Sequence, residues 1–202
     1  MMFEDSDDLP FDVIVTTPQG WAAAEVPSPA VQIAKDRFAQ HFAGRQPHLI
    51  DAQNGAGNYN WSGELGEMLV DQYLTERCYN FKWMADENEY EPDFLINGIS
   101  IDVKTKNVSS RPKLQDDYFS TVRHDQFVIA KRHGILGYIF CNYDYRNQWV
   151  YLMGKISYAQ FDKIKIERNV GDQVHDYYTV REKSWDVRLT DLTPPMQWTK
   201  TS

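Results

Sequence analysis

The feature that most constrains this fold is an Asn-Gly pair between two apolar runs. The stretch EPDFLINGISIDVKTK, residues 91 to 106, places Asn97-Gly98 at its centre. A two-residue type I′ turn needs a positive φ at both central positions, and Asn-Gly adopts this conformation readily. The stretch therefore predicts a β-hairpin with a fixed register. The expected opposed pairs are Ile96 with Ile99, Leu95 with Ser100, Phe94 with Ile101, and Asp93 with Asp102.

Side chains along each strand of such a hairpin alternate between its two faces. One face then carries the apolar set Phe94, Ile96, Ile99, Ile101 and Val103, with Thr105. The other face carries Asp93, Leu95, Ser100, Asp102 and Lys104. The sequence therefore predicts a core face and a polar face on which two carboxylates oppose each other.

Like charges on directly opposed residues destabilise a sheet. One interpretation is that Lys104, one pleat beyond Asp102, offsets the repulsion on a solvated polar face. The other is that a divalent cation lies between the carboxylates, because Mg²⁺ binds oxygen ligands at about 2.0–2.1 Å and often takes one or two carboxylates. The pairing pattern leaves both interpretations open.

The rest of the chain alternates helical and strand-like segments. The expected helices cover residues 30–42, 62–77 and 157–162, with loop and helix over 117–132. The expected strands cover residues 79–83, 135–142 and 149–153, with β-like pieces at 163–168, 177–181 and 185–189. We expect an α/β or α+β domain with a mixed sheet at 31–192, an N-terminal arm at 1–30 and a tail at 193–202.

Charge and composition bear on the class of partner. The net charge of −8 and the pI of about 5.1 argue against a polyanionic partner for the chain as a whole. Residues 104–132 nevertheless hold seven basic against three acidic side chains. The acidic start, the lack of a long apolar run and only two cysteines predict a reduced, cytoplasmic protein without a membrane partner.

The hairpin carries a resemblance to a known family. Pro92-Asp93, followed after eight residues by Asp102-Val103-Lys104, resembles the PD-(D/E)xK motif of the restriction-endonuclease-like nuclease superfamily. The preceding segment Gly63-Glu64-Leu65-Gly66-Glu67 is similar to the helix that carries a further acid in that family. The resemblance covers roughly residues 60–142 and implies a core of helix, three strands, helix and strand.

The resemblance also implies roles for individual residues. Asp93, Asp102, the Val103 carbonyl and Glu67 would bind Mg²⁺, with Mn²⁺ expected to substitute and Glu64 as the alternative helix acid. Lys104 would orient or help deprotonate the attacking water and stabilise charge on the phosphate. The expected DNA-binding rim consists of Lys106, Arg111, Lys113, Arg123, Lys131 and Arg132.

The resulting expectation is a metal-dependent deoxyribonuclease, an endonuclease rather than an exonuclease, whose small size would suit a homodimer. A metal and an ammonium can together activate water and neutralise charge on a phosphoryl group. A catalytically inactive nucleic-acid-binding or assembly protein of the same fold is the main alternative. An unrelated α/β protein with a salt-bridged hairpin face is the third.

Overall fold

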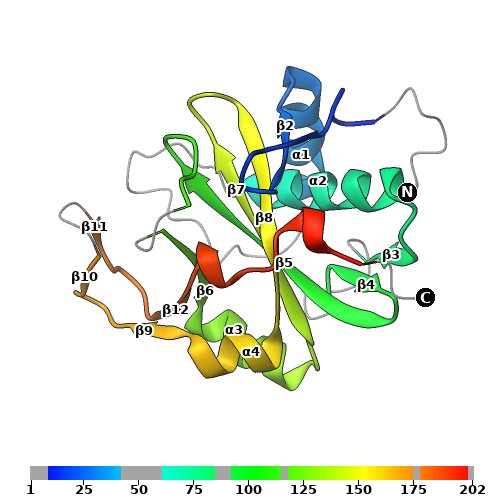
Figure 1. Ribbon diagram of the computed structural model, residues 1–202. Coiled ribbons are helices and arrows are strands. Elements are labelled where there is room, and N and C mark those ends of the chain that lie inside the picture. The colour runs from blue at the N-terminus through cyan, green and yellow to red at the C-terminus, as the bar shows by residue number, and fades with distance from the viewer. Residues whose placement is uncertain (1–8, 42–60, 85–91, 115–117, 175–177, 200–202) are drawn as a thin grey trace.

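A mixed β-sheet forms the framework of the molecule (Figure 1). The computed structural model describes residues 9–41, 61–84, 92–114, 118–174 and 178–199. Within these residues seven strands form the main sheet, in the order β1-β2-β8-β7-β5-β4-β3. The β5–β7 pair is parallel and the other pairs are antiparallel. The strands are β1 (Val15–Thr16), β2 (Ala22–Glu25), β3 (Phe81–Trp83), β4 (Phe94–Ile96), β5 (Ile99–Val108), β7 (Gly137–Asp144) and β8 (Trp149–Ser157).

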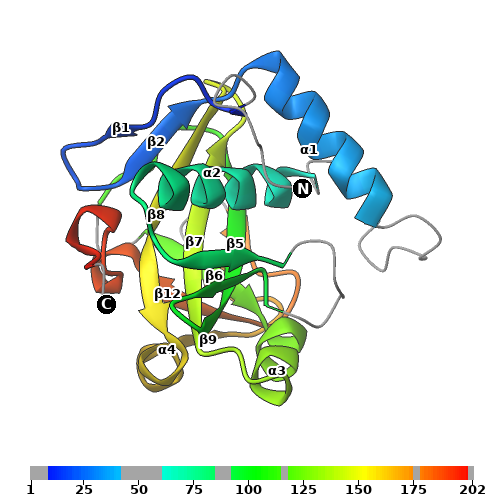
Figure 2. The ribbon, with the colours of Figure 1, turned by 90° about the vertical axis from the view of Figure 1, so that its right-hand side faces the viewer.

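Helices cover both faces of this sheet. Helix α2 (Ser62–Glu76) lies across β5, β7 and β8 on one face, and α1 (Ser28–His41) packs against α2 (Figure 2). Helix α4 (Tyr158–Ile164) contacts β7 and β8, and α3 (His124–Arg132) packs with it in the second core. A smaller antiparallel sheet packs with α3 and α4 in this second core. Its strands are, in order, β6 (Phe119–Arg123), β12 (Ser184–Arg188) and β9 (Ile166–Arg168). A short hairpin of β10 (Gln173–Val174) and β11 (Tyr178–Thr179) and two 3₁₀ turns, Leu189–Asp191 and Pro195–Gln197, complete the described elements.

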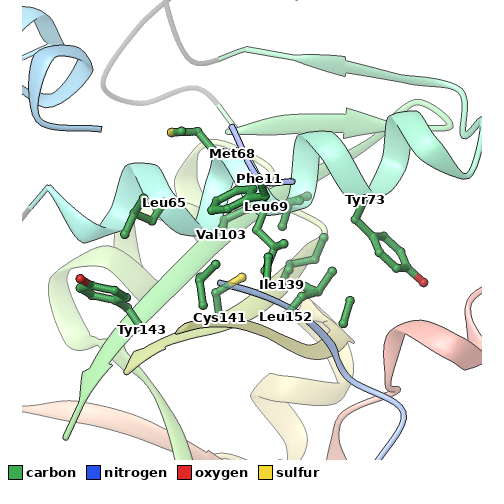
Figure 3. Close-up of a cluster of buried hydrophobic side chains, with 14 of the residues drawn as sticks. Phe11, Leu65, Met68, Leu69, Tyr73, Val103, Ile139, Cys141, Tyr143 and Leu152 are labelled. Atoms are coloured by element: carbon green, nitrogen blue, oxygen red, sulfur yellow. The ribbon is translucent and has the colours of Figure 1, made fainter. Parts of the chain in front are cut away.

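Two hydrophobic cores lie on opposite faces of the main sheet. The first lies between α2 and the sheet and includes Leu65, Leu69, Val103, Ile139 and Leu152 (Figure 3). The second lies under α3, α4 and the small sheet, and it includes Val122, Phe127, Tyr138, Phe140 and Phe161. Because β7 is central and covered on both faces, all eight of its residues are buried, as is typical of a strand between two layers.

The expectation of a mixed α/β architecture is confirmed, and most expected elements are present within a few residues of their expected bounds. One assignment is wrong: residues 119–123, expected to be loop or helix, form strand β6, and the helix begins only at His124. The cause is tertiary, because β6 pairs along its whole length with β12, about 65 residues later in the chain. The described ends of the chain also join the domain. β1 and β2 extend the main sheet beside β8, and Trp198 is buried against α2.

None of the helices in the described ranges is long and apolar enough to cross a membrane. Residues 1–8 of the expected arm, residues 42–60 before α2, and the last three residues of the expected tail lie outside the described residues.

Candidate active site

The hairpin has the expected turn and register. Asn97 and Gly98 have φ angles of 51° and 77°, the positive values that a type I′ turn requires. Strands β4 and β5 pair Ile96 with Ile99 and Phe94 with Ile101, so the register of the sequence prediction is confirmed. Continued by one residue, this register sets Asp93 opposite Asp102.

The two faces of the hairpin differ in polarity, as expected. Their burial, however, is not a simple division into a buried face and an exposed face. Phe94, Ile101 and Val103 are buried in the core under α2, whereas Ile99 at the turn is 46% exposed. Asp102 and Lys104 lie on the opposite face, in register with Tyr138 and Phe140 of β7, which belong to the second core. The solvated polar face, one of the two interpretations of the pattern, does not describe this structure, because Asp102 and Lys104 lie half-buried at the margin of a second core.

The site forms where β5 extends beyond its partner β4. Strand β4 pairs with β5 only through three residues, so β5 has an edge without a β4 partner from Asp102 onward. The Asp93 side chain lies along this edge, because its Oδ2 accepts a hydrogen bond of 2.5 Å from the Val103 amide. In the continued register Val103 opposes Pro92, which has no N–H to donate. The Val103 carbonyl therefore faces the same edge as the Asp93 carboxylate.

Gly66 allows α2 to lie close to this edge. A Cβ on Gly66 would lie 2.0 Å from Thr105 Oγ1, closer than real Cβ contacts, and 3.1 Å from Cys141 Cβ, which is a tight contact. A side chain there would require α2 to move away from the sheet or Thr105 to change rotamer. Gly66 therefore allows the close approach of α2 that carries the next residue, Glu67, to the edge of β5.

The structure separates the two helix acids. Glu64 is buried and forms an ion pair of 3.1 Å with Arg37 Nε on α1. Glu67 instead accepts a hydrogen bond of 3.2 Å from the Trp83 indole N–H on β3. Since Glu64 has a cation of its own and Glu67 lies within electrostatic range of Asp93 and Asp102, Glu67 is the helix acid that belongs to the cluster.

Negative charge exceeds positive charge in this cluster. Burial, with the charge of Glu64 second, raises the pKa of Glu67 to about 8. Burial and the charges of Glu67 and Asp102 raise the pKa of Asp93 well above its ordinary range. Burial alone would lower the pKa of Lys104, but the charges of Asp102 and Asp93 outweigh it and raise that pKa. Lys104 thus serves three carboxyl groups, and the only further help comes at Glu67 from Arg37, which is already paired with Glu64, among the interactions described.

Lys104 lies closest to Asp102, with Nζ 2.6 Å from Oδ1. The two side chains are 19% and 15% exposed, so water screens this pair less than a surface pair. The salt bridge anticipated as one interpretation of the pattern is present. Among the interactions described, neither Asp93 nor Glu67 has a cation as close to it as Lys104 is to Asp102.

The donor atoms of the cluster suit a hard cation. Carboxylate oxygens of Asp93, Asp102 and Glu67 and the Val103 carbonyl are the ligand types that Mg²⁺ prefers. In this conformation Asp102 is paired with Lys104 and Asp93 with the Val103 amide. No group of three or more His, Cys, Asp or Glu side chains in the described ranges is already arranged around a cation position. Metal binding would therefore require these carboxylates to exchange their present partners.

The basic residues of the expected rim occupy different environments. Lys106 is exposed on β5 and donates to the Phe119 carbonyl at 3.2 Å, and Arg111 and Lys113 are exposed beyond the end of β5. Lys131 and Arg132 are exposed at the end of α3, close to the hairpin, since Ser100 Oγ donates to the Gly134 carbonyl at 2.7 Å. Arg123 instead pairs with Asp125 and Glu182 at 3.1 Å and 3.0 Å, so its charge is already balanced.

The sequence interpretation did not include Trp83 and Arg37. Trp83 donates to Glu67, and the Arg37 guanidinium lies 4.0 Å from the centre of the Trp83 ring. A partial signal was present, because Trp83 lies in the strand leading into the hairpin and pairs with Phe94, the neighbour of Asp93. No local pattern indicates Arg37, since its contact with Glu64 spans 27 residues.

The chain was also compared with known proteins. A scan of family models and searches of curated proteins and of solved structures found no match to this sequence or fold.

Proposed function

We propose that this chain is a Mg²⁺-dependent nuclease that hydrolyses phosphodiester bonds in DNA and that its core is restriction-endonuclease-like. The single observation that carries the proposal is the cluster at the edge of β5 beyond the end of β4, where Glu67, Asp93, Asp102 and Lys104 lie within electrostatic range of one another. Buried carboxyl groups with raised pKa values and a shared ammonium are typical of functional sites.

Asp93, Asp102 and Glu67, with the Val103 carbonyl, would hold the metal. The ion would neutralise carboxylate repulsion and, when bound, supply a more acidic water and a positive charge near the phosphate. Two observations support this role: the Val103 amide fixes the Asp93 carboxylate, and the close approach at Gly66 and the Trp83 indole fix Glu67. The proposed role of these residues is therefore to bind the metal ion and to hold one another in position around it.

Lys104 is proposed to act as a cation. Its raised pKa keeps the ammonium protonated at neutral pH, so it donates hydrogen bonds instead of accepting a proton. In this position it can orient the attacking water and stabilise the charge that develops on the phosphoryl oxygens. Deprotonation of the water by Lys104, which the resemblance also allows, fits the charge of the site less well.

The proposed substrate is DNA because exposed basic residues flank the acidic edge. Lys131 and Arg132 lie at the hairpin end of β5, and Arg111 and Lys113 lie beyond its other end. A ten-residue strand spans about 33 Å. Phosphates on either side of a scissile bond can therefore meet cations while the net charge of the chain is −8.

The test is cleavage of linear, circular and single-stranded DNA with Mg²⁺ or EDTA, by the wild type and Lys104→Ala. We expect Mg²⁺-dependent cleavage that Lys104→Ala reduces by about a thousandfold, since the loss of a transition-state donor costs about 10²–10³ or more in rate. Cleavage of circular DNA would identify an endonuclease.

Lys165→Ala is the matched control. Lys165 has almost the same side-chain exposure as Lys104, 18% against 19%, and also pairs with an aspartate, Asp162. It lies on the small-sheet side of the molecule, against Phe127 and Trp185, so its loss should leave cleavage per folded molecule unchanged. DNA binding without cleavage under every metal condition would instead favour a non-catalytic nucleic-acid-binding protein.

A further inference from the structure

Trp83 links the helix acid of the cluster to the hairpin acid. Its indole Nε1–H donates to Glu67 Oε2 at 3.2 Å. Its backbone pairs with Phe94, the residue after Asp93, and the next residue, Met84, donates its amide to the Asp93 carbonyl at 2.8 Å. Trp83 therefore fixes the position of α2 relative to the start of β4.

Two side chains pack against the Trp83 ring. Phe94 stacks on one side, with ring centroids 5.7 Å apart and an interplanar angle of 8°. The Arg37 guanidinium lies 4.0 Å from the ring centroid, within the range of a cation–π contact. Arg37 is fixed by its ion pair with Glu64. The indole consequently has little freedom to rotate away from Glu67.

We propose that Trp83 is a positioning residue that orients Glu67 toward the metal, and that Arg37 holds Trp83 in place. The inference rests on the proposed nuclease function and deepens it. The indole bond occupies one oxygen of Glu67 and would leave the second oxygen for a cation. Outer partners that orient a ligand in this way typically change metal affinity by about 10–100-fold when they are removed.

Arg37 has a second effect in this arrangement. It pairs with Glu64 and thereby keeps that acid away from the metal ligands. The pair Glu64 and Glu67, three residues apart on α2, is thus divided into one acid held by Arg37 and one acid held by Trp83. In this arrangement Glu64 holds Arg37 in place, and Glu67 is the proposed metal ligand.

The test compares Trp83→Phe with the wild type. Phenylalanine keeps an aromatic ring beside Arg37 and Phe94 but has no N–H. Mn²⁺ affinity, measured by calorimetry on the DNA-free protein, should fall by about tenfold. The Mg²⁺ concentration that half-saturates cleavage should rise by a similar factor, whereas KM for DNA at saturating Mg²⁺ should stay unchanged.

Trp198→Phe is the matched control. Trp198 also donates its indole N–H to a protein oxygen, the Thr193 carbonyl at 2.9 Å, and also lies beside a cation, Lys155 at 5.0 Å. It contacts Tyr73 at the far end of α2, so its loss should leave Mn²⁺ affinity unchanged. Arg37→Gln supplies a second variant, which keeps a flat group without the charge and should weaken Mn²⁺ binding to a smaller extent.

A double-mutant cycle separates positioning from general stability. Trp83→Phe should have no further effect on Mn²⁺ affinity in a Glu67→Gln background if it acts through Glu67. Wild-type cleavage with unchanged Mn²⁺ affinity in Trp83→Phe would overturn the positioning role alone. A wild type that binds no Mn²⁺ and cleaves no DNA would overturn the nuclease function and this inference together.

Discussion

Two half-buried carboxylate–cation pairs in this molecule differ in how their charge is balanced. On the small sheet Asp186 pairs with Arg168 at 2.8 Å and accepts from Thr121 Oγ1 at 2.6 Å. At the edge of β5 Asp102 pairs with Lys104 at 2.6 Å. The two cations are equally exposed, at 19%, and Asp186 is more buried than Asp102, at 7% against 15%, so deeper burial does not single out the pair at β5.

The difference lies in the neighbours. Asp186 accepts hydrogen bonds from Arg168 and Thr121 and also lies within electrostatic range of Lys106, so its charge is balanced. Lys104 is shared among Asp102, Asp93 and Glu67, and two of these carboxyl groups have strongly raised pKa values. A fold that needs only stability balances its buried charges, as at Asp186. The unbalanced set at β5 is therefore the better candidate for a site that binds a cation.

The largest expected effect concerns pH. Glu67 has a folded pKa of about 8 against an ordinary value of 4.5, and the pKa of Asp93 is also raised. Such groups contribute stability that is complete below pH 4.5 and is lost as pH rises through 8. Without metal, the free energy of unfolding should fall by about 3 kcal/mol between pH 5 and pH 8.5, after allowance for partial solvent screening.

Urea denaturation in EDTA at several pH values measures this slope. Glu67→Gln should flatten it, whereas Glu182→Gln, an exposed glutamate paired with Arg123, should not. Mg²⁺ should oppose the fall at high pH, because a metal binds the deprotonated carboxylates. Stability that is constant over this range in the wild type would contradict the excess of negative charge at β5.

The second expected effect compares the removal of one charge from each region. Asp186→Asn should lower the free energy of unfolding by about 2 kcal/mol, because it leaves Arg168 half-buried without its charged partner. Asp93→Asn should leave it unchanged or raise it in EDTA, since the amide oxygen can still accept from Val103. Thermal denaturation at pH 7.5 checks both variants, and equal losses would show that the two regions are balanced alike.

The comparison also shows what the sequence could predict. The register at Asn97-Gly98 depends on a turn preference and on alternation, both of which are local, so the opposed positions of Asp93 and Asp102 could be derived. The pairing of Asp186 could not, because β6, β9 and β12 come from three separate segments. Arg37 was missed for the same reason. Burial of the polar face was also missed, since the second core under it assembles from distant elements.

The smallest expected effect concerns the two glycines of α2, because the packing of this helix on the sheet decides how close Glu67 lies to the hairpin. At Gly63 a Cβ would meet no atom within 4 Å, whereas at Gly66 it would meet Thr105 and Cys141. Gly63→Ala should therefore stabilise the helix slightly, by up to about 1 kcal/mol. Gly66→Ala should destabilise the protein by about 1–2 kcal/mol, because α2 must move outward or Thr105 must change rotamer.

The movement has a consequence that stability alone does not show. If α2 shifts outward, Glu67 leaves Asp93 and Asp102, so Mn²⁺ affinity should fall in Gly66→Ala and not in Gly63→Ala. Thr105→Ala in the Gly66→Ala background removes the closest contact, at 2.0 Å, and should restore part of both losses. Urea denaturation and calorimetry on the same samples measure the two quantities. A stability loss in Gly66→Ala with full Mn²⁺ affinity would mean that the packing of α2 and the position of Glu67 are independent, whereas a joint loss ties the charge imbalance at β5 to the close approach of this helix.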